Sequence, residues 1–321
     1  MSILVTNGGL LTTIQDLGRY GFQSFGVNPC GAMDRHATRL LNELLGNEPN
    51  SAVIEMHFPA GEYLFERSIQ FALGGADFSA ELSQKRISNW TAVQASAGDI
   101  LSFPKRRIGS RAYIAVRGGV NAESWLGSVS TSLQTGMAGF RGRKLKVGDR
   151  ISFADNLSGL GATTGQRIGC SLTPNYSVSP VVRVIRGPEF DAMTAKSQQT
   201  FLGKQYKISH RSDRMGFRLE GPTLYKLSES EMLSSGTTFG TVQLLNDGQM
   251  IVLMADHQTT GGYPRIATIA SVDLPLIAQL TAGDKVTFQM TSVDEAERLL
   301  LDWEKSLAFL KQGLRFRQQR L

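Results

Sequence analysis

A short pattern of a turn followed by a strand occurs three times along the 321-residue chain. The three copies read AGDILSF at 97–103, VGDRISF at 147–153 and AGDKVTF at 282–288. In each copy the glycine permits a tight turn, the aspartate can accept hydrogen bonds from turn amides, and the alternating apolar residues direct one face of a strand into a core. This repetition predicts related β-rich halves, although common turn chemistry can also produce three short matches.

Few helices are expected among the many short strands, so the chain lacks the alternating strand and helix rhythm of a doubly wound sheet. Glycine contributes 34 residues, and charged residues make up only 19% of the sequence, which suits short strands joined by tight turns. The length exceeds that of one average domain. Residues 155–179 are rich in Gly, Ser, Thr and Asn, the composition of a linker. We therefore expect two mainly β domains, barrels or sandwiches with small added helices, at residues 1–165 and 166–321.

Three helices are predicted from capping signals. The first begins after Asp34, carries an apolar face and ends at Gly46, the residue type favoured just past a helix end. Pro188 suits the first turn of a second helix that runs to about Phe201. The third begins after Ser292, where the sequence SVDE has the spacing of a capping box.

The formal net charge of +6 does not by itself indicate nucleic-acid binding. Part of the excess lies in the C-terminal tail, at Lys311, Arg315, Arg317 and Arg320. Another dense basic run, at 105–107, has no interleaved aromatic residues of the kind that bind single strands. We expect a solvated loop there and no nucleic-acid partner.

The two cysteines, Cys30 and Cys170, lie far apart and outside any Cys-x-x-Cys or Cys/His cluster, so neither a zinc site nor a disulfide scaffold is expected. The first residues lack the basic start and long apolar core of a signal peptide, and no segment approaches the length of a membrane span. A cytoplasmic protein without a membrane partner is the resulting expectation.

The strongest site candidate is the polar loop 256–264, which directly follows a run of five apolar residues that is typical of a buried strand. Gln243, from a neighbouring predicted strand, and Gln258 can present both a hydrogen-bond donor and an acceptor to an amide or urea-like ligand. Asp256 beside His257 suggests a general base. Adjacent strand residues point to opposite faces, however, which weakens their direct pairing.

Three further polar segments each allow a structural interpretation as well. The segment 11–34 combines Thr, Gln, Asp and Gly residues, but Asp34 can simply cap a helix there. Arg117, at a predicted strand end beside two glycines, can hold a carboxylate or phosphate or form a structural ion pair. The segment 209–222 holds several charged groups, which can also be ordinary surface salt bridges.

Several familiar catalytic signatures are absent from the sequence. The chain has no GxxxxGK[ST] phosphate loop, no GxSxG nucleophile elbow, no HExxH and no complete GxGxxG after a strand. A common ATP site is therefore not expected on this chain, and nucleotide handling would require an unusual site or another chain.

Several long motifs, all in the same order, give the chain a resemblance to the allophanate hydrolase subunit 2 family, also called the biotin-dependent carboxyltransferase C/D domain family. The motifs are GLLTTIQDLGR at 9–19 with GAMD at 31–34, RGPE at 186–189, SDRMG at 212–216 and ADHQTTGGYP at 255–264. They span nearly the whole chain, and together they are more specific than any one of them. Within the family the chain looks most like the 5-oxoprolinase branch.

The resemblance implies two cyclophilin-like β-barrel domains with a few short helices. It implies one component of a complex that uses ATP to hydrolyse 5-oxo-L-proline to L-glutamate. The implied partners are the A and B subunits of 5-oxoprolinase, of which B resembles allophanate hydrolase subunit 1. Relatives suggest two alternatives: a carboxyltransferase region that works with carboxybiotin in urea carboxylase, and a non-catalytic subunit that regulates its partner. The chain has no biotin-attachment motif of the Met-Lys type, so any biotin would be on a partner.

Loop composition and the motif match together give hypotheses for the site residues. The candidate catalytic residues are Asp256, His257 and Asp213, and the candidate substrate-binding residues are Gln243, Gln258, Thr259, Arg214, Arg117 and Asp34. In this hypothesis the two arginines bind anionic oxygens, the glutamines orient a small amide, and the histidine moves protons with its neighbouring aspartate. No metal ligand is predicted, and ATP is expected at the level of the complex, with no site assigned on this chain.

Overall fold

The computed structural model describes residues 2–153, 164–228 and 232–318, apart from the side chains of residues 315, 317 and 318. The chain forms two compact units. The segments of unit 1 are Met1–Arg19, Cys30–Asn175 and Glu304–Leu321, and those of unit 2 are Tyr20–Pro29 and Tyr176–Trp303.

The two units are not the contiguous domains that local composition suggests. Their main changeover, at 175/176, lies inside the linker-like segment 155–179, of which residues 155–163 fall outside the described residues. Residues 20–29 belong to unit 2 by their contacts, although they lie within the N-terminal part of the sequence. Residues 304–321 belong to unit 1, although they lie at the C-terminal end. Local composition does not predict these two assignments, because they depend on tertiary contacts.

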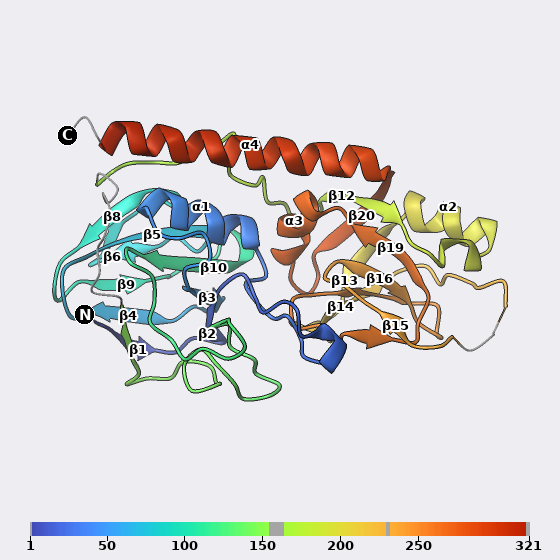
Figure 1. Cartoon of the computed structure of the whole chain (residues 1–321), viewed down its shortest axis with the longest axis horizontal. Coiled ribbons are helices and arrows are strands. Elements are labelled where there is room, and N and C mark those ends of the chain that lie inside the picture. Colours follow the sequence, from blue (N-terminus) through green and yellow to red (C-terminus); the bar gives the residue numbers. More distant parts are fainter. Residues whose placement is uncertain (1, 154–163, 229–231, 319–321) are drawn as a thin grey trace. The chain divides into compact units, whose positions relative to one another are not determined.

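Unit 1 contains two antiparallel sheets (Figure 1). The six-stranded sheet has the order β11-β1-β4-β9-β6-β7, with β1 at Ser2–Asn7, β4 at Glu62–Phe65, β6 at Glu81–Leu82, β7 at Lys85–Arg86, β9 at Ile100–Ser102 and β11 at Arg150–Ser152. The five-stranded sheet has the order β2-β3-β10-β5-β8, with β2 at Thr12–Gln15, β3 at Val53–His57, β5 at Ile69–Asp77, β8 at Ala92–Ala95 and β10 at Ile108–Val116. The predicted mainly β character is confirmed.

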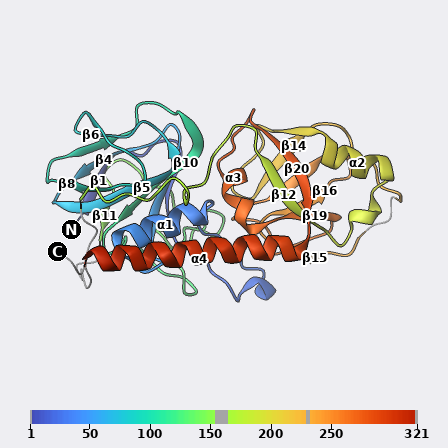
Figure 2. The same cartoon turned by 90° about the horizontal axis from the view of Figure 1, so that it is seen from above.

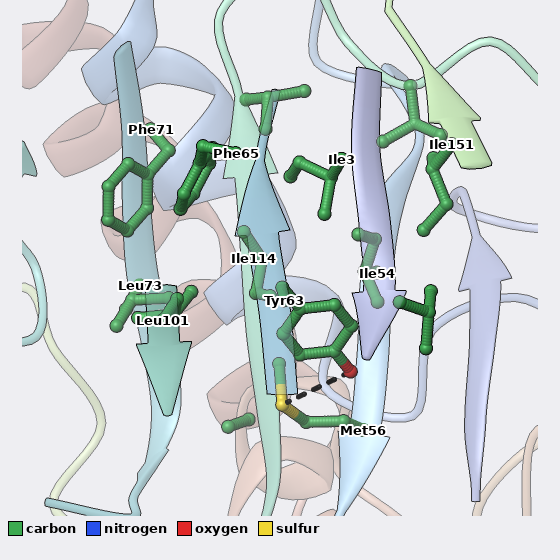
Figure 3. Packing of buried hydrophobic residues seen from close by; sticks show 14 of the residues in the cluster. Ile3, Ile54, Met56, Tyr63, Phe65, Phe71, Leu73, Leu101, Ile114 and Ile151 are labelled. Atoms are coloured by element: carbon green, nitrogen blue, oxygen red, sulfur yellow. Dashed lines mark hydrogen bonds between the residues drawn. The ribbon is translucent and has the colours of Figure 1, made fainter. Parts of the chain in front are cut away.

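Side chains from both sheets form one hydrophobic core in unit 1 (Figure 3). Burial alternates along β1, where Ile3 and Val5 are fully buried, because successive strand residues point to opposite faces. Phe65 of one sheet contacts Phe71 of the other, with ring centroids 5.0 Å apart. The contact joins the two sheets across the core.

The helix predicted after Asp34 is α1, Arg35–Leu45. The Asp34 carboxylate accepts a hydrogen bond from Ala37 N at 2.9 Å, and Gly46 ends the helix in the left-handed region, with a φ of 71°. The helix packs on β5 and β10 (Figure 1). Both predicted ends of this helix are confirmed.

The three repeated turns share the predicted geometry. In each, the aspartate carboxylate accepts a hydrogen bond from the backbone N–H three residues earlier, and the preceding glycine has a φ of 89–93°. The donor and acceptor residues are Ser96 and Asp99 at 2.8 Å, Lys146 and Asp149 at 2.8 Å, and Thr281 and Asp284 at 3.0 Å. A strand follows each turn directly, so this local prediction is confirmed in both units.

Unit 2 is built on a closed β-barrel. The strand order is β12-β19-β16-β17-β14-β13-β20, with β12 at Val181–Arg186, β13 at Gln205–Ile208, β14 at Gly216–Glu220, β16 at Thr241–Leu244, β17 at Met250–Leu253, β19 at Arg265–Ile269 and β20 at Lys285–Thr291. Strands β12 and β20 pair in parallel, and the other neighbours are antiparallel. Two short strands, β15 at Ser235–Gly236 and β18 at Thr260–Gly261, form a separate pair.

The second predicted helix is interrupted near its start. A 3₁₀ turn, η2 at Phe190–Ala192, ends in extended backbone at Met193. Helix α2 at Ala195–Gly203 begins only after Thr194, whose side chain caps it, and packs on β20 (Figure 2). The predicted start at Pro188 is therefore wrong, because the extended backbone at Met193 separates this turn from α2.

The third predicted helix is α4, Val293–Gln318 (Figure 2). At its start Ser292 Oγ accepts a hydrogen bond from Glu295 N at 3.1 Å. The helix is much longer than the short helices expected, and its residues after Trp303 belong to unit 1. The sequence does not predict three smaller segments: η1 at Gln23–Phe25, η3 at Ser271–Asp273 and α3 at Leu274–Ala278. None of the helices in the described ranges combines the length and the hydropathy that crossing a bilayer requires.

Candidate functional site

A pocket lies on the outer face of the unit 2 barrel. Val242 of β16 and Val252 of β17 are directly opposite and fully buried in the barrel interior, so their strand neighbours point outward. On the outside, Gln243 of β16 and Arg218 of β14 both lie opposite Ile251 of β17. The pocket has a volume of about 260 Å³, and its lining residues are Arg211, Asp213, Met215, Gly216, Arg218, Gln243, Leu245, Ile251, Leu253, Gln258 and Tyr263.

Gln243 is the most unusual polar residue of this pocket. It is 1% exposed, and neither Oε1 nor Nε2 has a hydrogen-bond partner among the described residues. Gly261 packs against it, because a Cβ at this position would lie 2.6 Å from Gln243 Nε2 and 3.2 Å from Gln258 Nε2. Burying an amide without partners is unfavourable, so the Gln243 side chain marks a position where a ligand can supply both a donor and an acceptor.

An ion pair anchors the start of the loop 256–264. Arg214 donates from Nε to Asp256 Oδ2 and from Nη2 to Asp256 Oδ1, both at 2.9 Å, and the two side chains are 5% and 11% exposed. The Asp256 carbonyl accepts a further bond from Asn28 Nδ2 at 2.8 Å. Both oxygens of the predicted catalytic carboxylate therefore bond to an internal guanidinium, and the predicted anion-binding guanidinium already holds an internal anion.

His257 supports the neighbouring glutamine. Its Nδ1 lies 2.6 Å from the carbonyl oxygen of Gln258, and Thr237 Oγ1 donates to the same oxygen at 2.5 Å. Because a carbonyl oxygen only accepts hydrogen bonds, Nδ1 is the protonated ring nitrogen in this contact. His257 is 2% exposed, so the structure gives it a part in positioning Gln258, and its role in proton transfer stays a prediction.

Two arginines at the pocket have no internal partner. The guanidinium groups of Arg211 and Arg218 make no hydrogen bond or ion pair with a described residue, and both residues are exposed. Asp213 is also exposed, and its Oδ1 accepts bonds from Met215 N at 2.8 Å and Gly216 N at 3.2 Å, which shapes the turn before β14. The two arginines lie in the predicted polar segment 209–222, although the sequence alone does not single them out there.

The remaining predicted residues do not line this pocket. Thr259 contributes its backbone carbonyl, which accepts a bond from Thr237 N at 3.0 Å. Asp34 caps α1, in agreement with its structural interpretation. Arg117 follows β10 and donates its backbone N–H to Gln70 O at 2.9 Å; it and Asp34 belong to unit 1.

The RGPE motif holds β19 in place next to the pocket. Arg265 donates to Glu189 from Nε at 3.0 Å and from Nη2 at 2.8 Å, and its backbone N–H donates to the same carboxylate at 2.9 Å. The Arg265 guanidinium holds the pKa of the Glu189 carboxyl below its usual range. A Cβ at Gly187 would lie 2.0 Å from Arg265 O, so only glycine fits there. Arg265 is the cross-strand neighbour of Gln243, so the motif holds the strand next to Gln243 in position.

The first motif has a structural role in unit 1. Asp16 Oδ1 accepts bonds from Gly18 N at 2.8 Å, Ser128 Oγ at 2.7 Å and Ser130 Oγ at 2.6 Å, and its Oδ2 accepts one from Val129 N at 2.9 Å. Buried Arg19 stacks its guanidinium over the Trp125 ring, 4.9 Å from the centroid. These contacts tie the segment to the loop 125–130. The hydrogen bonds of Asp16 therefore hold this loop in place.

The barrel fold and the motif positions define a protein of the carboxyltransferase-domain class. Residues 25–290 match the family described as carboxyltransferase domain, subdomain A and B, and the chain belongs to this family. It is 36% identical over 301 residues to the C subunit of 5-oxoprolinase from Escherichia coli K12, in an alignment that covers 94% of this chain and 95% of that protein. It is 37% identical over 287 residues to the C subunit of 5-oxoprolinase from Haemophilus influenzae, with 89% of this chain and 90% of that protein covered.

Solved structures agree with the family. The K. lactis urea amidolyase superposes with a TM-score of 0.90 at 29% identity, over 96% of this chain and 20% of that longer protein. The expected family membership and the β-barrel fold class are therefore confirmed.

Proposed function

We propose that this chain is one component of an ATP-dependent 5-oxoprolinase, a complex that hydrolyses 5-oxo-L-proline to L-glutamate with cleavage of ATP. The observation that carries the proposal is the buried Gln243 amide, which has neither a donor nor an acceptor partner among the described residues. The two relatives named as the C subunit of 5-oxoprolinase support it, because each aligns with this chain over nearly its own full length.

The lactam of 5-oxoproline complements this glutamine. A lactam carries one N–H donor and one C=O acceptor side by side, and a glutamine amide offers the matching acceptor and donor. Gln258, at the rim of the same pocket, provides a second amide. In the proposed complex these side chains orient the lactam and polarise its carbonyl, while Asp256 and His257 hold the loop that presents Gln258.

ATP supplies the driving force for opening an unstrained, resonance-stabilised amide: activation of the carbonyl oxygen makes the carbonyl carbon open to attack by water. This chain has no GxxxxGK[ST] loop of the kind that holds ATP phosphates. We therefore place the nucleotide on the complex outside this pocket. The expected partners are the B subunit of 5-oxoprolinase, which is of the allophanate hydrolase subunit 1 type, and its A subunit.

A second candidate function is carboxyl transfer to a urea-like amide. The structural similarity to urea amidolyase favours it, and the same two glutamines would bind such an amide. In that case biotin would be carried by a partner, because this chain has no attachment motif.

The test is glutamate release from 5-oxoproline with ATP, measured for the chain purified with its co-encoded partners, and again with the chain omitted. We expect release that requires this chain and that falls at least about tenfold with Gln243→Met, the effect of losing hydrogen bonds to the substrate. Gln205→Met, which removes an exposed amide from β13, is the matched control. No release from a folded complex, together with carboxylation of urea in the presence of a biotinylated partner, would favour the second function.

A further inference from the structure

Arg211 and Arg218, whose guanidinium groups bond to no described residue, differ from three other arginines of unit 2. Arg183, Arg214 and Arg265 each bind a carboxylate through two guanidinium nitrogens, with Asp273, Asp256 and Glu189 as their partners. No described residue plays this part for Arg211 or Arg218. Bidentate binding of a carboxylate is the arrangement that guanidinium geometry favours, and here it is left for a ligand.

Both arginines lie where two hollows meet. They line the Gln243 pocket and also a neighbouring hollow of about 380 Å³. The further residues of that hollow are Ser209, Leu219, Glu220, Gly221, Leu245, Asp247, Gln249 and Met250. The cationic groups therefore stand at the rim of the amide pocket, where an anionic group of a ligand would be partly exposed to water.

The register of the strands sets the spacing between amide and cation. Arg218 and Gln243 lie on opposite sides of Ile251 in the same cross-strand row. Neighbouring strands are about 4.8 Å apart, so the two backbones are on the order of 10 Å apart. Both side chains project from the outer face of the barrel, so a small ligand lying on that face can contact Gln243 and Arg218 together.

We infer that Arg211 and Arg218 bind the carboxylate of a lactam held at Gln243, and so select a carboxylated lactam over a neutral amide. The inference rests on the proposed function. A singly charged carboxylate fits better than a phosphate dianion, because the exposed carboxylate of Asp213 lines the same pocket and repels the larger charge more strongly. Urea has no carboxylate, so it makes no use of the two arginines.

The test is isothermal titration of the full chain with 5-oxo-L-proline and with 2-pyrrolidinone, the same lactam without its carboxylate. We expect 5-oxoproline to bind roughly ten- to hundredfold more tightly than 2-pyrrolidinone, the range for a charge-assisted bond. Arg218→Gln and Arg211→Gln should each remove much of this preference and leave 2-pyrrolidinone binding unchanged, whereas Arg218→Lys should keep part of it. Lys196→Gln removes the same charge from an exposed position on α2 and should change neither affinity.

Two results would overturn the inference, and they are distinguishable. If 5-oxoproline binds and the arginine variants, with unchanged melting temperatures, retain the full preference, the carboxylate is held elsewhere and the proposed function stands. If the wild-type chain binds neither lactam, the amide pocket itself is refuted, and the inference fails with the proposed function at this site.

Discussion

Gln243 is buried with an amide that has no partner among the described residues, and this makes a specific prediction about stability. Gln243→Met keeps the approximate size of the side chain and removes both polar groups. We expect the free energy of unfolding to stay equal or to rise by about 1–3 kcal/mol, because an unsatisfied buried group is lost. Urea denaturation of the full chain measures this, with Gln205→Met as the control. A clear fall in stability would mean that an internal partner normally satisfies the amide.

The buried pair of Arg214 and Asp256 predicts the opposite behaviour. Asp256→Asn leaves the guanidinium buried without its anion, so we expect a loss of about 3–5 kcal/mol in the free energy of unfolding. The double variant Asp256→Leu with Arg214→Met removes both charges and should lose less than the single variant. Urea denaturation of the wild type, the single variant and the double variant measures these differences in the free energy of unfolding.

An exposed ion pair gives the matched comparison for this loss. Asp191 pairs with Arg186, and their side chains are 71% and 55% exposed. Asp191→Asn should cost no more than about 1 kcal/mol. An equally small effect of Asp256→Asn would contradict the structural role given to that residue.

At the residue scale, the sequence predicts which amide side chains line the pocket, but it does not predict which arginines are paired internally. Gln243 and Gln258 are predicted to serve the same site, and both line the pocket. The polar segment 209–222 is also predicted, but nothing local tells which of its arginines is neutralised internally. That depends on Asp256, which lies 42 positions after Arg214 and bonds to it.

At the scale of elements, the ion pair of Glu189 with Arg265 links the turn between β12 and η2 to β19. The pKa of Glu189 is lowered by the Arg265 guanidinium, so the unfolded chain binds a proton more readily than the folded one. The stabilisation is therefore fully present above the unfolded pKa of about 4.3, and it is lost as the pH falls through the lower folded pKa.

The corresponding prediction concerns Glu189→Gln. We expect this variant to melt at a lower temperature than the wild type at pH 7, and the difference to shrink as the pH is lowered from about 5 to about 3. Differential scanning fluorimetry across this pH range measures it. Glu297→Gln, which changes an exposed carboxylate on α4, should show no such convergence. A constant difference at all pH values would assign the effect to packing instead.

The helix prediction that is wrong falls where a distant strand contacts the segment. A proline followed by a glutamate is typical of a first helical turn, and the local sequence gives no sign of the arginine on β19. The predictions for the helices after Asp34 and Ser292 are correct because their caps are bonds within a few residues. Local sequence signals thus predict helices whose ends are capped by side chains a few residues away. They fail where a residue on a distant strand bonds to the segment.

At the scale of the whole molecule, α4 contributes to unit 1 through its second part. Leu307 and Leu314 are 4% and 7% exposed, and Glu304 bonds to Arg39 on α1 at 2.8 Å. Leu307→Ala should lower the free energy of unfolding by about 2–5 kcal/mol. Hydrogen exchange should become faster in α1 and in the sheets of unit 1, with little change in the barrel strands of unit 2.

Phe309 on the same helix provides the control for this prediction. It is 73% exposed, so Phe309→Ser should change stability by no more than about 0.5 kcal/mol. Faster exchange in the barrel strands of the Leu307→Ala chain, at the same level as in α1, would show that the two units unfold together.

The division of the chain also has a consequence for its synthesis on the ribosome. Domains usually finish folding in the order in which they emerge, with the N-terminal one first. Here every segment of the barrel unit has been translated by Trp303, whereas the unit that begins at the N-terminus still awaits 304–321. The unit that is translated first therefore cannot complete its fold ahead of the barrel, because its last segment is translated after every segment of the barrel.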